Sequence, residues 1–412
     1  MKNILLFTTL LAFACNTPQK TVNGQSNPIV LTSADAINYA NTITQEELKE
    51  HLYTYASDDF EGRETGKPGQ KKAVAYLKSQ YEALSVPAAK PDGDYFQKVP
   101  LEMAKVPEGK IALNGSDFEL GEDVLTFSEA IGNSNEIVYA GYGIETDNYS
   151  DYKGLDVAGK LVLIKAGEPV NADGTYVISG TDNKSVWGNM SEAIGKKSEL
   201  ATDKGAKGIL YYDEQNFPRY KGYFDYMKRN GSGQMALKED DNDNFLVLLN
   251  KTSATALKGD IEKDSAPKTI AVDIVLDVKS ANDEINSENV VAVIKGSEKP
   301  NEYVVISSHL DHIGVSANGD INNGADDDGS GSVALLEIAE AFKKAADEGK
   351  GPKRSIIFLH VTGEEKGLLG SRYYTDFDPI VPLSQTVANL NIDMIGRIDP
   401  KRKGDRNYIY LI

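Results

Sequence analysis

Residues 303–311 read YVVISSHLD, and this stretch determines the predicted fold. Its first six residues are rich in valine and isoleucine, which predicts a strand. His309 and Asp311 follow directly, and residues two apart in an extended backbone point in the same direction. The stretch therefore predicts a strand that ends at a site with two polar side chains facing one way.

Three more apolar runs, residues 289–295, 355–361 and 387–392, are predicted strands, and residues 330–348 are a predicted helix. Strands that alternate with helices predict an α/β fold in which a mostly parallel mixed sheet is flanked by helices. Ligands of such sheets bind beyond the carboxyl ends of the strands. We therefore expect the functional site at that edge.

Carboxylates also lie next to the other predicted elements. Glu364 and Glu365 follow the strand predicted at 355–361, Asp393 follows the strand predicted at 387–392, and residues 326–331 (DDDGSG) lead into the predicted helix. A histidine and carboxylates that converge on one sheet edge supply the nitrogen and oxygen ligands that zinc accepts. A zinc-bound imidazole normally donates its other N–H to a carboxylate, and Asp311 is suitably spaced to accept it from His309.

The three remaining histidines have other expected roles. His51 belongs to a predicted amphipathic helix and is expected at the surface. His360 lies within an apolar strand and is expected to be packed or bonded to the backbone. His312 is next to the site, where support of the ligands or of the loop is favoured over metal ligation.

The first fifteen residues have the pattern of an export signal. Lys2 precedes an apolar stretch from residue 4 to residue 14, which is too short to span a bilayer as a permanent helix. Cys15 follows, and the polar residues 16–33 are a predicted tether. This pattern resembles a bacterial lipoprotein signal, so we expect a periplasmic or cell-surface protein anchored by a lipid on Cys15. The alternative is a plainly secreted protein.

Composition limits the classes of protein that the chain can represent. Its 412 residues are 40% hydrophobic and carry a formal net charge of −18. These values fit a globular protein of two or three domains and argue against nucleic acid as a partner. Short strands and loops dominate residues 126–285, which predicts a β-rich domain inserted between residues 34–125 and 286–412 of the main domain.

Four motifs in this order resemble those of the di-zinc exopeptidases typified by bacterial leucyl aminopeptidases. They are HLDHIG at 309–314, NGADDDGSG at 323–331, GEEKGLLGS at 363–371 and NIDMIGR at 391–397. The inserted region, with YAGYG at 139–143 and GAKG at 205–208, is similar to the protease-associated domain of many members. The resemblance implies the zinc exopeptidase fold and an aminopeptidase whose substrates are peptides with a free N-terminus.

The resemblance also implies two zinc ions. Asp327 would bridge them, His309 and Asp393 would complete the protein ligands of one ion, and Glu365 would bind the other. Two ions held about 3.5–4 Å apart activate a water between them.

Two further acids have roles in the same resemblance. Glu364 would be the general base, and Asp311 would orient His309. Glu364 cannot also be a ligand if it removes the proton of the water and hands it to the leaving amine. The adjacent Glu364 and Glu365 therefore need different environments.

One feature departs from the family, which has a further histidine downstream of Asp393 as the last ligand of the Glu365 ion. The last histidine here is His360. We therefore expect the chain to be C-terminally incomplete relative to the family, and its second ion, with two protein ligands, to bind weakly. The alternatives are a carboxypeptidase or a glutaminyl cyclase on the same zinc core, or a non-catalytic receptor-like relative. The presence of all the acids favours an enzyme.

Overall fold

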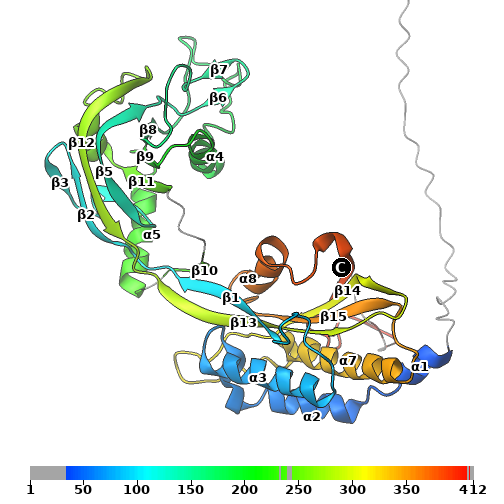
Figure 1. The fold of residues 1–412 in the computed structure, drawn as a ribbon. Helices are drawn as coiled ribbons and strands as arrows, with labels where there is room; N and C mark the ends of the chain where they lie inside the picture. Colours follow the sequence, from blue (N-terminus) through cyan, green and yellow to red (C-terminus); the bar gives the residue numbers. More distant parts are fainter. Residues whose placement is uncertain (1–33, 232, 239–243, 406–407, 409–412) are drawn as a thin grey trace, which may run out of the picture.

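The computed structural model describes residues 34–231, 233–238, 244–405 and 408, which form two bodies, each built on its own sheet (Figure 1). The predicted export signal, Cys15 and the predicted tether at 16–33 lie outside the described residues. None of the described helices combines the length and the apolar composition that a bilayer span requires.

The first body contains a sheet of six strands. In spatial order they are β10 (Met235–Leu237), β1 (Phe96–Met103), β13 (Asp283–Ile294), β15 (Arg354–Val361), β14 (Lys299–His309) and β16 (Thr386–Asn391). The predicted mixed α/β sheet is confirmed, but only β14 pairs in parallel, with β15 and with β16. A short connection at 295–298 makes β13 run against β14, whereas a helix provides the crossover that parallel pairing requires between β14 and β15.

Four helices cover one face of this sheet (Figure 1). They are α1 (Ala34–Ala40), α2 (Gln45–Tyr55), α3 (Pro68–Ala83) and α7 (Gly331–Asp347). Leu77 and Tyr81 of α3 and Leu335 of α7 belong to a core with Phe358 of β15, and all four side chains are buried. On the other face, Tyr374 packs in a second core with apolar residues of β14 and β15. The predicted helix at 330–348 is thus confirmed as the crossover element α7.

The second body contains a sheet of eight strands. In spatial order they are β3 (Ser116–Phe118), β2 (Glu108–Leu113), β12 (Lys268–Lys279), β5 (Ala130–Tyr139), β8 (Leu161–Lys165), β9 (Gly208–Tyr212), β11 (Phe245–Leu249) and β4 (Val124–Leu125). The strands β5, β8, β9 and β11 pair in parallel, each with the next. The helices of this body are α4 (Met190–Asp203), α5 (Phe217–Asn230) and α6 (Lys251–Leu257).

The chain passes between the bodies through residues 104–107, from β1 to β2, and through residues 280–282, from β12 to β13. The strands β2, β3 and β4 pair in the second sheet, so the boundary predicted between residues 125 and 126 is wrong. These strands are short, and their sequence does not reveal which sheet they join. The short strand β10 also returns from the inserted region to pair with β1. That the second body is a protease-associated domain stays a prediction.

Candidate metal centre

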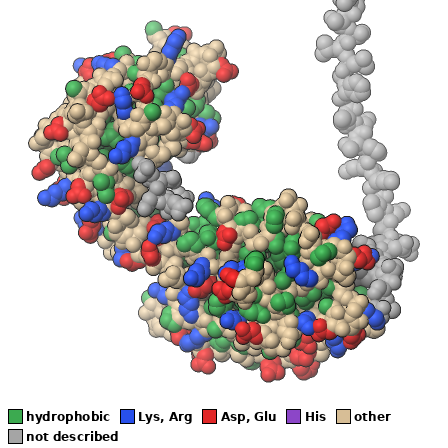
Figure 2. Space-filling model, in the orientation of Figure 1, with side chains coloured by type: hydrophobic (Ala, Val, Ile, Leu, Met, Phe, Trp, Pro, Cys, Tyr) green, Lys and Arg blue, Asp and Glu red, His purple; other side chains and the backbone are tan. Residues whose placement is uncertain are grey.

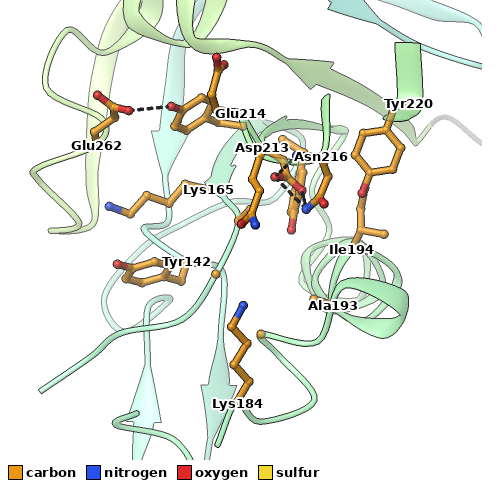
Figure 3. A pocket seen from close by; sticks show the side chains of 16 residues that line it. Tyr142, Lys165, Lys184, Ala193, Ile194, Asp213, Glu214, Asn216, Tyr220 and Glu262 are labelled. Carbon is orange, nitrogen blue, oxygen red and sulfur yellow. Dashed lines mark hydrogen bonds between the residues drawn. The ribbon is translucent and has the colours of Figure 1, made fainter. Parts of the chain in front are cut away.

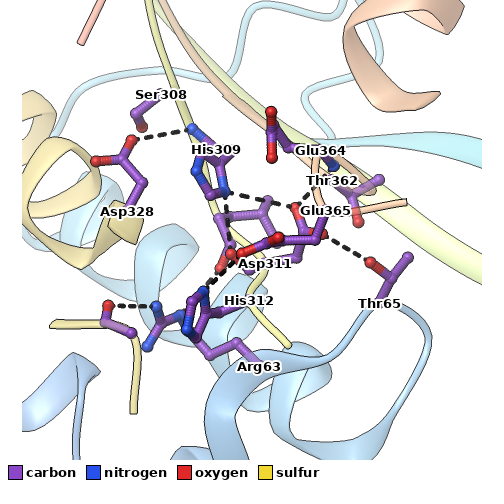
Figure 4. Close-up of polar contacts among 12 residues, drawn as sticks. Arg63, Thr65, Ser308, His309, Asp311, His312, Asp328, Thr362, Glu364 and Glu365 are labelled. Atoms are coloured by element: carbon purple, nitrogen blue, oxygen red, sulfur yellow. Dashed lines mark hydrogen bonds and ion pairs between the residues drawn. The ribbon is translucent and has the colours of Figure 1, made fainter. Parts of the chain in front are cut away.

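Predicted site residues gather at the carboxyl ends of the parallel strands of the first body (Figure 4). His309 is the last residue of β14, and the segment Ala325–Ser330 leads into α7. Glu364 follows β15 by three residues, and Asp393 follows β16 by two. The sheet topology therefore brings together residues that lie up to 84 positions apart, from 309 to 393.

The first group of candidate ligands is His309, Asp327 and Asp393, whose ligand atoms lie within 4.8 Å of one another. His309 Nε2 is 3.1 Å from Asp327 Oδ1 and 3.9 Å from Asp393 Oδ1. His309 Nδ1 lies 3.0 Å from the main-chain oxygen of Asp311, which assigns the proton to Nδ1 and leaves Nε2 as an acceptor. Burial lowers the pKa of His309, but the carboxylates of Asp328 and Asp311 outweigh burial and raise it.

Asp311 is fully buried, and its carboxylate is held by two donors. Thr65 Oγ1 donates to Oδ2 over 2.8 Å, and the main-chain N–H of Glu364 donates to Oδ1 over 3.1 Å. The carboxylate is 3.9 Å from His309 Nδ1, beyond hydrogen-bond distance. The structure therefore differs from the predicted contact: the main-chain carbonyl of Asp311, rather than its carboxylate, accepts from the imidazole. The carboxylate instead links the His309 loop to Glu364.

The second group of candidate ligands is His312, Asp327 and Glu365. His312 Nδ1 is 2.7 Å from Glu365 Oε1, and the two side chains are 12% and 19% exposed. Asp327 thus belongs to both groups, as a bridging ligand would. The sequence prediction gave the second ion only Asp327 and Glu365, whereas the structure also places an imidazole beside them.

Glu364 lies next to both groups without belonging to either. It lines a cavity together with His309 and Asp393. Burial raises the pKa of Glu364, and the neighbouring carboxylates of Asp311 and Glu365 add to this rise, against an opposing effect of His309. A carboxylate whose affinity for a proton is increased suits a group that must accept one.

The residues of both groups fit divalent cations. Burial raises the pKa of Asp393, and the facing carboxylates of Asp327 and Glu365 raise it further because like charges crowd the same space. One imidazole nitrogen and several carboxylate oxygens form a donor set that zinc accepts. Cations at the two groups would neutralise this crowded negative charge.

Asp328 is a residue of the site that sequence reasoning missed. It is fully buried, and its carboxylate accepts from the main-chain N–H groups of His309 at 3.3 Å, Gly331 at 2.9 Å and Met394 at 3.2 Å. It thereby ties together the three segments that carry His309, Asp327 and Asp393. Nothing in a run of three aspartates distinguishes the one that accepts backbone hydrogen bonds from the one that is the candidate metal ligand.

Arg63 is the second missed residue, and it comes from a distant segment before α3. Its side chain is fully buried and donates to four main-chain carbonyl groups, two of which flank the site. Nε reaches the carbonyl of Leu310 at 3.1 Å, and Nη2 reaches that of Gly324 at 2.7 Å. Nη1 bonds those of Asn323 and Tyr55. Arg63 therefore joins the His309 loop to the Asp327 loop.

A cavity of about 370 Å³ opens beside His309, Glu364 and Asp393. Its apolar walls come from both strands and helices, namely Val305, Leu359, Val361, Leu368, Tyr374 and Leu383. Figure 2 shows hydrophobic side chains gathered on the face of the first body that is turned toward the second body. The centre therefore borders a space that can receive an apolar group.

Comparisons with known proteins match this part of the chain. Residues 289–406 match the model of Peptidase family M28. The probable glutamate carboxypeptidase LAMP1 of Arabidopsis thaliana is 37% identical over 106 residues, which are 26% of this chain and 14% of that protein. The probable leucine aminopeptidase 2 of Aspergillus oryzae is 26% identical over 69% of this chain and 46% of its own length.

Two further relatives match more of the chain. Aminopeptidase YwaD of Bacillus subtilis is 24% identical over 89% of this chain and 66% of its own length. A solved aminopeptidase from Aneurinibacillus sp. strain AM-1 is 20% identical, with a TM-score of 0.38 over 90% of this chain and 74% of that chain. The chain thus spans less than two thirds of the length of the three curated relatives. The segment that carries all the predicted site residues, 289–406, is the part of the chain that is similar to Peptidase family M28.

Proposed function

We propose that this protein is an exported, zinc-dependent aminopeptidase that releases N-terminal residues from peptides, with Glu364 as the general base. The observation that carries the proposal is the convergence of His309, Asp327 and Asp393 beside Glu364 in a segment that is similar to family M28. Two of its relatives, an aminopeptidase and a probable leucine aminopeptidase, support this reaction class.

In this proposal, His309, Asp327 and Asp393 hold one zinc ion, and Asp327 and Glu365 hold a second. When bound, the ions would polarise the scissile carbonyl and lower the pKa of a water toward neutrality. The side chains of Asp327 and Asp393 are 38% and 42% exposed, so their oxygens are open to solvent and to ligands. The acidic edge also attracts the free α-ammonium group of a peptide.

Glu364 moves the proton in this proposal. Its carboxylate accepts a proton from the attacking water and returns it to the amine of the leaving peptide, so no net charge is left on the protein. The main-chain N–H of Glu364 donates a hydrogen bond to the buried carboxylate of Asp311. This hydrogen bond fixes the backbone position from which the Glu364 side chain extends. The adjacent cavity receives the side chain of the N-terminal residue, and its apolar walls suit an apolar one.

A carboxypeptidase is the second candidate, because the relative with 37% identity in the site region is named a probable glutamate carboxypeptidase. Such an enzyme needs a basic group to hold the carboxylate of its substrate. Among the described residues that line the cavity beside the site, none is lysine or arginine.

The proposal also includes the location of the protein. The apolar stretch before Cys15 supports export, and the cysteine after it supports a lipid anchor at the periplasmic or cell surface. The mass of the mature N-terminal peptide tests this part. A diacylated Cys15 is expected, and an unmodified N-terminus that retains Met1 would contradict export.

The reaction itself is tested with the purified chain and zinc on one peptide, either with a free N-terminus or N-acetylated. We expect release of amino acid from the free peptide only, and Glu364→Gln should lower kcat by about 10²–10⁴ without loss of bound zinc. The matched control is Glu262→Gln in the second body, which should leave kcat unchanged. Cleavage of the acetylated peptide, or full activity of Glu364→Gln, would refute the proposal.

A further inference from the structure

The second body has a cavity that the proposed function does not use. It has a volume of about 410 Å³ and opens where the parallel strands β8 and β9 end, at Lys165 and Tyr212 (Figure 3). The carboxyl ends of parallel strands are frequent ligand sites, and this volume is sufficient for a small molecule. Two lysines, Lys165 and Lys184, line the cavity together with aromatic and apolar side chains.

Lys165 is a buried cation without an acidic partner. It is 6% exposed, and its ammonium donates to the carbonyl of Ile261 at 3.2 Å but forms no ion pair with any described carboxylate. Lys197 is fully buried and donates at 2.6 Å to the carbonyl of Gly167, which lines the cavity. Within the described part of the chain it also has no ion pair. Buried charge without a counter-charge costs free energy, which an anion in the cavity would offset.

Lys258, the third buried lysine of this body, shows the contrast. Its ammonium forms ion pairs with the carboxylates of Asp260 and Asp264. Burial lowers the pKa of Lys165, and the nearby ammonium of Lys258 lowers it further. The two lysines next to the cavity therefore lack the counter-charge that Lys258 has.

The three carboxylates that line the cavity already have protein partners. Asp213 accepts from the side-chain amide of Asn216 at 2.8 Å. Glu262 forms an ion pair with the ammonium of Lys251 at 2.8 Å, and Glu214 accepts from the main-chain N–H of Lys251 at 2.6 Å. The charge left without a partner in the cavity is therefore positive, and it suits an anion better than a cation.

The second lysine of the cavity, Lys184, is held in place by its neighbour. Ser185 donates its main-chain N–H and its hydroxyl to the buried carboxylate of Glu168, at 2.8 and 2.7 Å. A Cβ atom at Gly188 would come within 2.3 Å of the same carboxylate, so the loop packs closely against it. Lys184 itself is exposed and has no ion pair among the residues that the structure describes. Its ammonium is thus free to bind a ligand.

Helix α5 begins beside the cavity, where a phosphate would need free main-chain N–H groups. The N–H groups of Asn216 and Phe217 already donate to Asp213, at 3.1 and 2.9 Å. Pro218 has no N–H group. The start of α5 therefore disfavours a phosphate, and the lysines favour a carboxylate.

We infer that this cavity binds a small organic carboxylate, whose carboxylate group contacts Lys165 and Lys184. The apolar part of the ligand lies against Tyr220 and Ile194, which Figure 3 shows on the side of the cavity away from Lys165. A free amino acid and the C-terminal end of a peptide both carry such a group. The inference does not depend on the proposed function, because all these residues belong to the second body.

Calorimetric titration of the full 412-residue chain with zinc tests the inference. The probes are isocaproate and its neutral amide, which differ only in the carboxylate. We expect one equivalent of isocaproate to bind, and the amide to bind at least about 10-fold more weakly because it lacks the charge. Inorganic sulfate should not compete. Equal binding of acid and amide, binding of neither, or competition by sulfate would overturn the inference.

Substitutions locate the bound isocaproate. Lys165→Met should weaken its binding by about 10-fold or more, because a buried charged donor is lost. Lys184→Gln changes an exposed side chain, so the variant should fold normally and bind about 2–5-fold more weakly. Lys207→Gln is the matched control, at an exposed lysine before the other end of β9, and should bind as the wild type does. Unchanged binding in Lys184→Gln, or an equal loss in Lys207→Gln, would overturn the inference.

Two competitors distinguish the sources of the carboxylate. L-leucine carries it on a free amino acid, and N-acetyl-alanyl-leucine carries it on the end of a peptide whose N-terminus is blocked. The competitor that displaces isocaproate identifies the source, and displacement by neither would overturn the inference. A chain that binds these acids but hydrolyses no peptide would contradict the proposed function and not this inference.

Discussion

In the first body, the parallel strands β15, β14 and β16 lead to Glu364, His309 and Asp393, whereas in the second body β8 and β9 end at Lys165 and beside Asp213. A cavity opens at both places, of about 370 Å³ in the first body and about 410 Å³ in the second. This shared position follows from topology, because parallel strands leave space beyond their carboxyl ends. The chemistry of the two cavities differs.

The carboxylates of the second cavity are already satisfied by protein donors (Figure 3). Both oxygens of Asp213 accept from the side-chain amide of Asn216, at 2.8 and 3.1 Å. Glu262 accepts from Tyr212 Oη at 3.2 Å. Lys165 donates to a main-chain carbonyl and lies 4.7 Å above the ring centre of Tyr142. The carboxylate oxygens of Asp213 and Glu262 in the second cavity therefore already accept hydrogen bonds from neighbouring side chains.

The carboxylates of the first cavity face one another and an imidazole instead. Both groups of candidate metal ligands found among the described residues lie in this body. The first cavity differs from the second in having a histidine at the end of its strand. It also has buried residues, such as Asp311 and Asp328, that hold the surrounding loops by accepting hydrogen bonds from backbone N–H groups.

The largest expected effect is that of Asp327→Asn, which removes the residue common to both groups. Loss of a bridging carboxylate weakens both ions, so zinc affinity should fall by more than about 100-fold, and hydrolysis should fall below detection. Equilibrium dialysis with zinc analysis measures the change. The same substitution at the second cavity, Asp213→Asn, should leave zinc binding intact, and equal losses in both variants would abolish the distinction between the cavities.

Arg63→Lys tests whether the first body needs a rigid frame. Lysine cannot reproduce the planar fork that bonds the carbonyl groups of Leu310, Asn323 and Gly324. Buried carbonyl groups left unpaired cost about 1–3 kcal/mol each, so we expect a loss of about 2–4 kcal/mol in the unfolding free energy of the first body. Zinc binding should weaken by about 10–100-fold, as for other residues that support ligands.

Two controls confine this effect to the first body. Arg372→Lys changes an exposed arginine of the same body and should alter stability by no more than about 0.5 kcal/mol. Trp187, the sole tryptophan of the chain, lies in the second body, and its fluorescence should report unchanged unfolding there in Arg63→Lys. Unchanged zinc affinity in Arg63→Lys would show that the loops keep their positions without the guanidinium.

Sequence reasoning found the parts of the site that depend on short-range pattern. The valine- and isoleucine-rich run before His309 predicted β14, and the two-residue spacing placed Asp311 at the same strand end. Asp393 was predicted because it follows another apolar run at the same sheet edge. Pattern and resemblance together predicted these residues, and the structure places His309 and Asp393 close to each other at the ends of neighbouring strands.

The remaining parts depend on contacts that no local pattern carries. Arg63 reaches Leu310 across 247 positions of sequence, and a single arginine in a glycine-rich turn gives no sign of its partners. The contact between His312 and Glu365 spans 53 positions and depends on how two loops pack. The boundary at residue 125 failed for a similar reason, because the short strand β4 joins the second sheet by pairing with β11.

Lys197→Met tests the buried charge of the second body. Lys197 is fully buried in α4, and its ammonium donates to the main-chain carbonyl of Gly167 at 2.6 Å. Burial lowers its pKa from 10.5 to about 8, although Asp151 and Glu168 oppose this. Between these values the unfolded chain holds more protons than the folded one, so stability should rise as pH increases above 8, by about 3 kcal/mol at most.

The variant should lose this rise, because methionine has no proton to release. Trp187 fluorescence during urea unfolding at pH 7.5 and at pH 9.5 measures it, and the quantity to compare is the difference between wild type and variant at each pH. Equal changes in both proteins would assign the rise to other groups of the second body.

The smallest expected effect is that of Glu337→Gln, and its pH dependence has the opposite sign. Glu337 is buried in α7, and burial, with the nearby carboxylates of Glu47 and Glu340, raises its pKa from 4.5 to about 7. The folded chain therefore keeps a proton that the unfolded chain has released, and stability should fall as pH rises from about 4.5 to 7. Glutamine resembles the protonated acid and removes this loss.

At pH 7.5 the variant should therefore be more stable than the wild type by about 1–2 kcal/mol, since His51 Nε2, 3.4 Å from Glu337, offsets part of the cost. Hydrogen exchange of the α7 amides measures the first body alone. Glu298→Gln, at an exposed site of the same body, should show no such gain. If Glu337→Gln instead lost stability at pH 7.5, the carboxylate would be ionised and bound to His51, and buried charge would be tolerated in the first body as it is at Lys197 in the second.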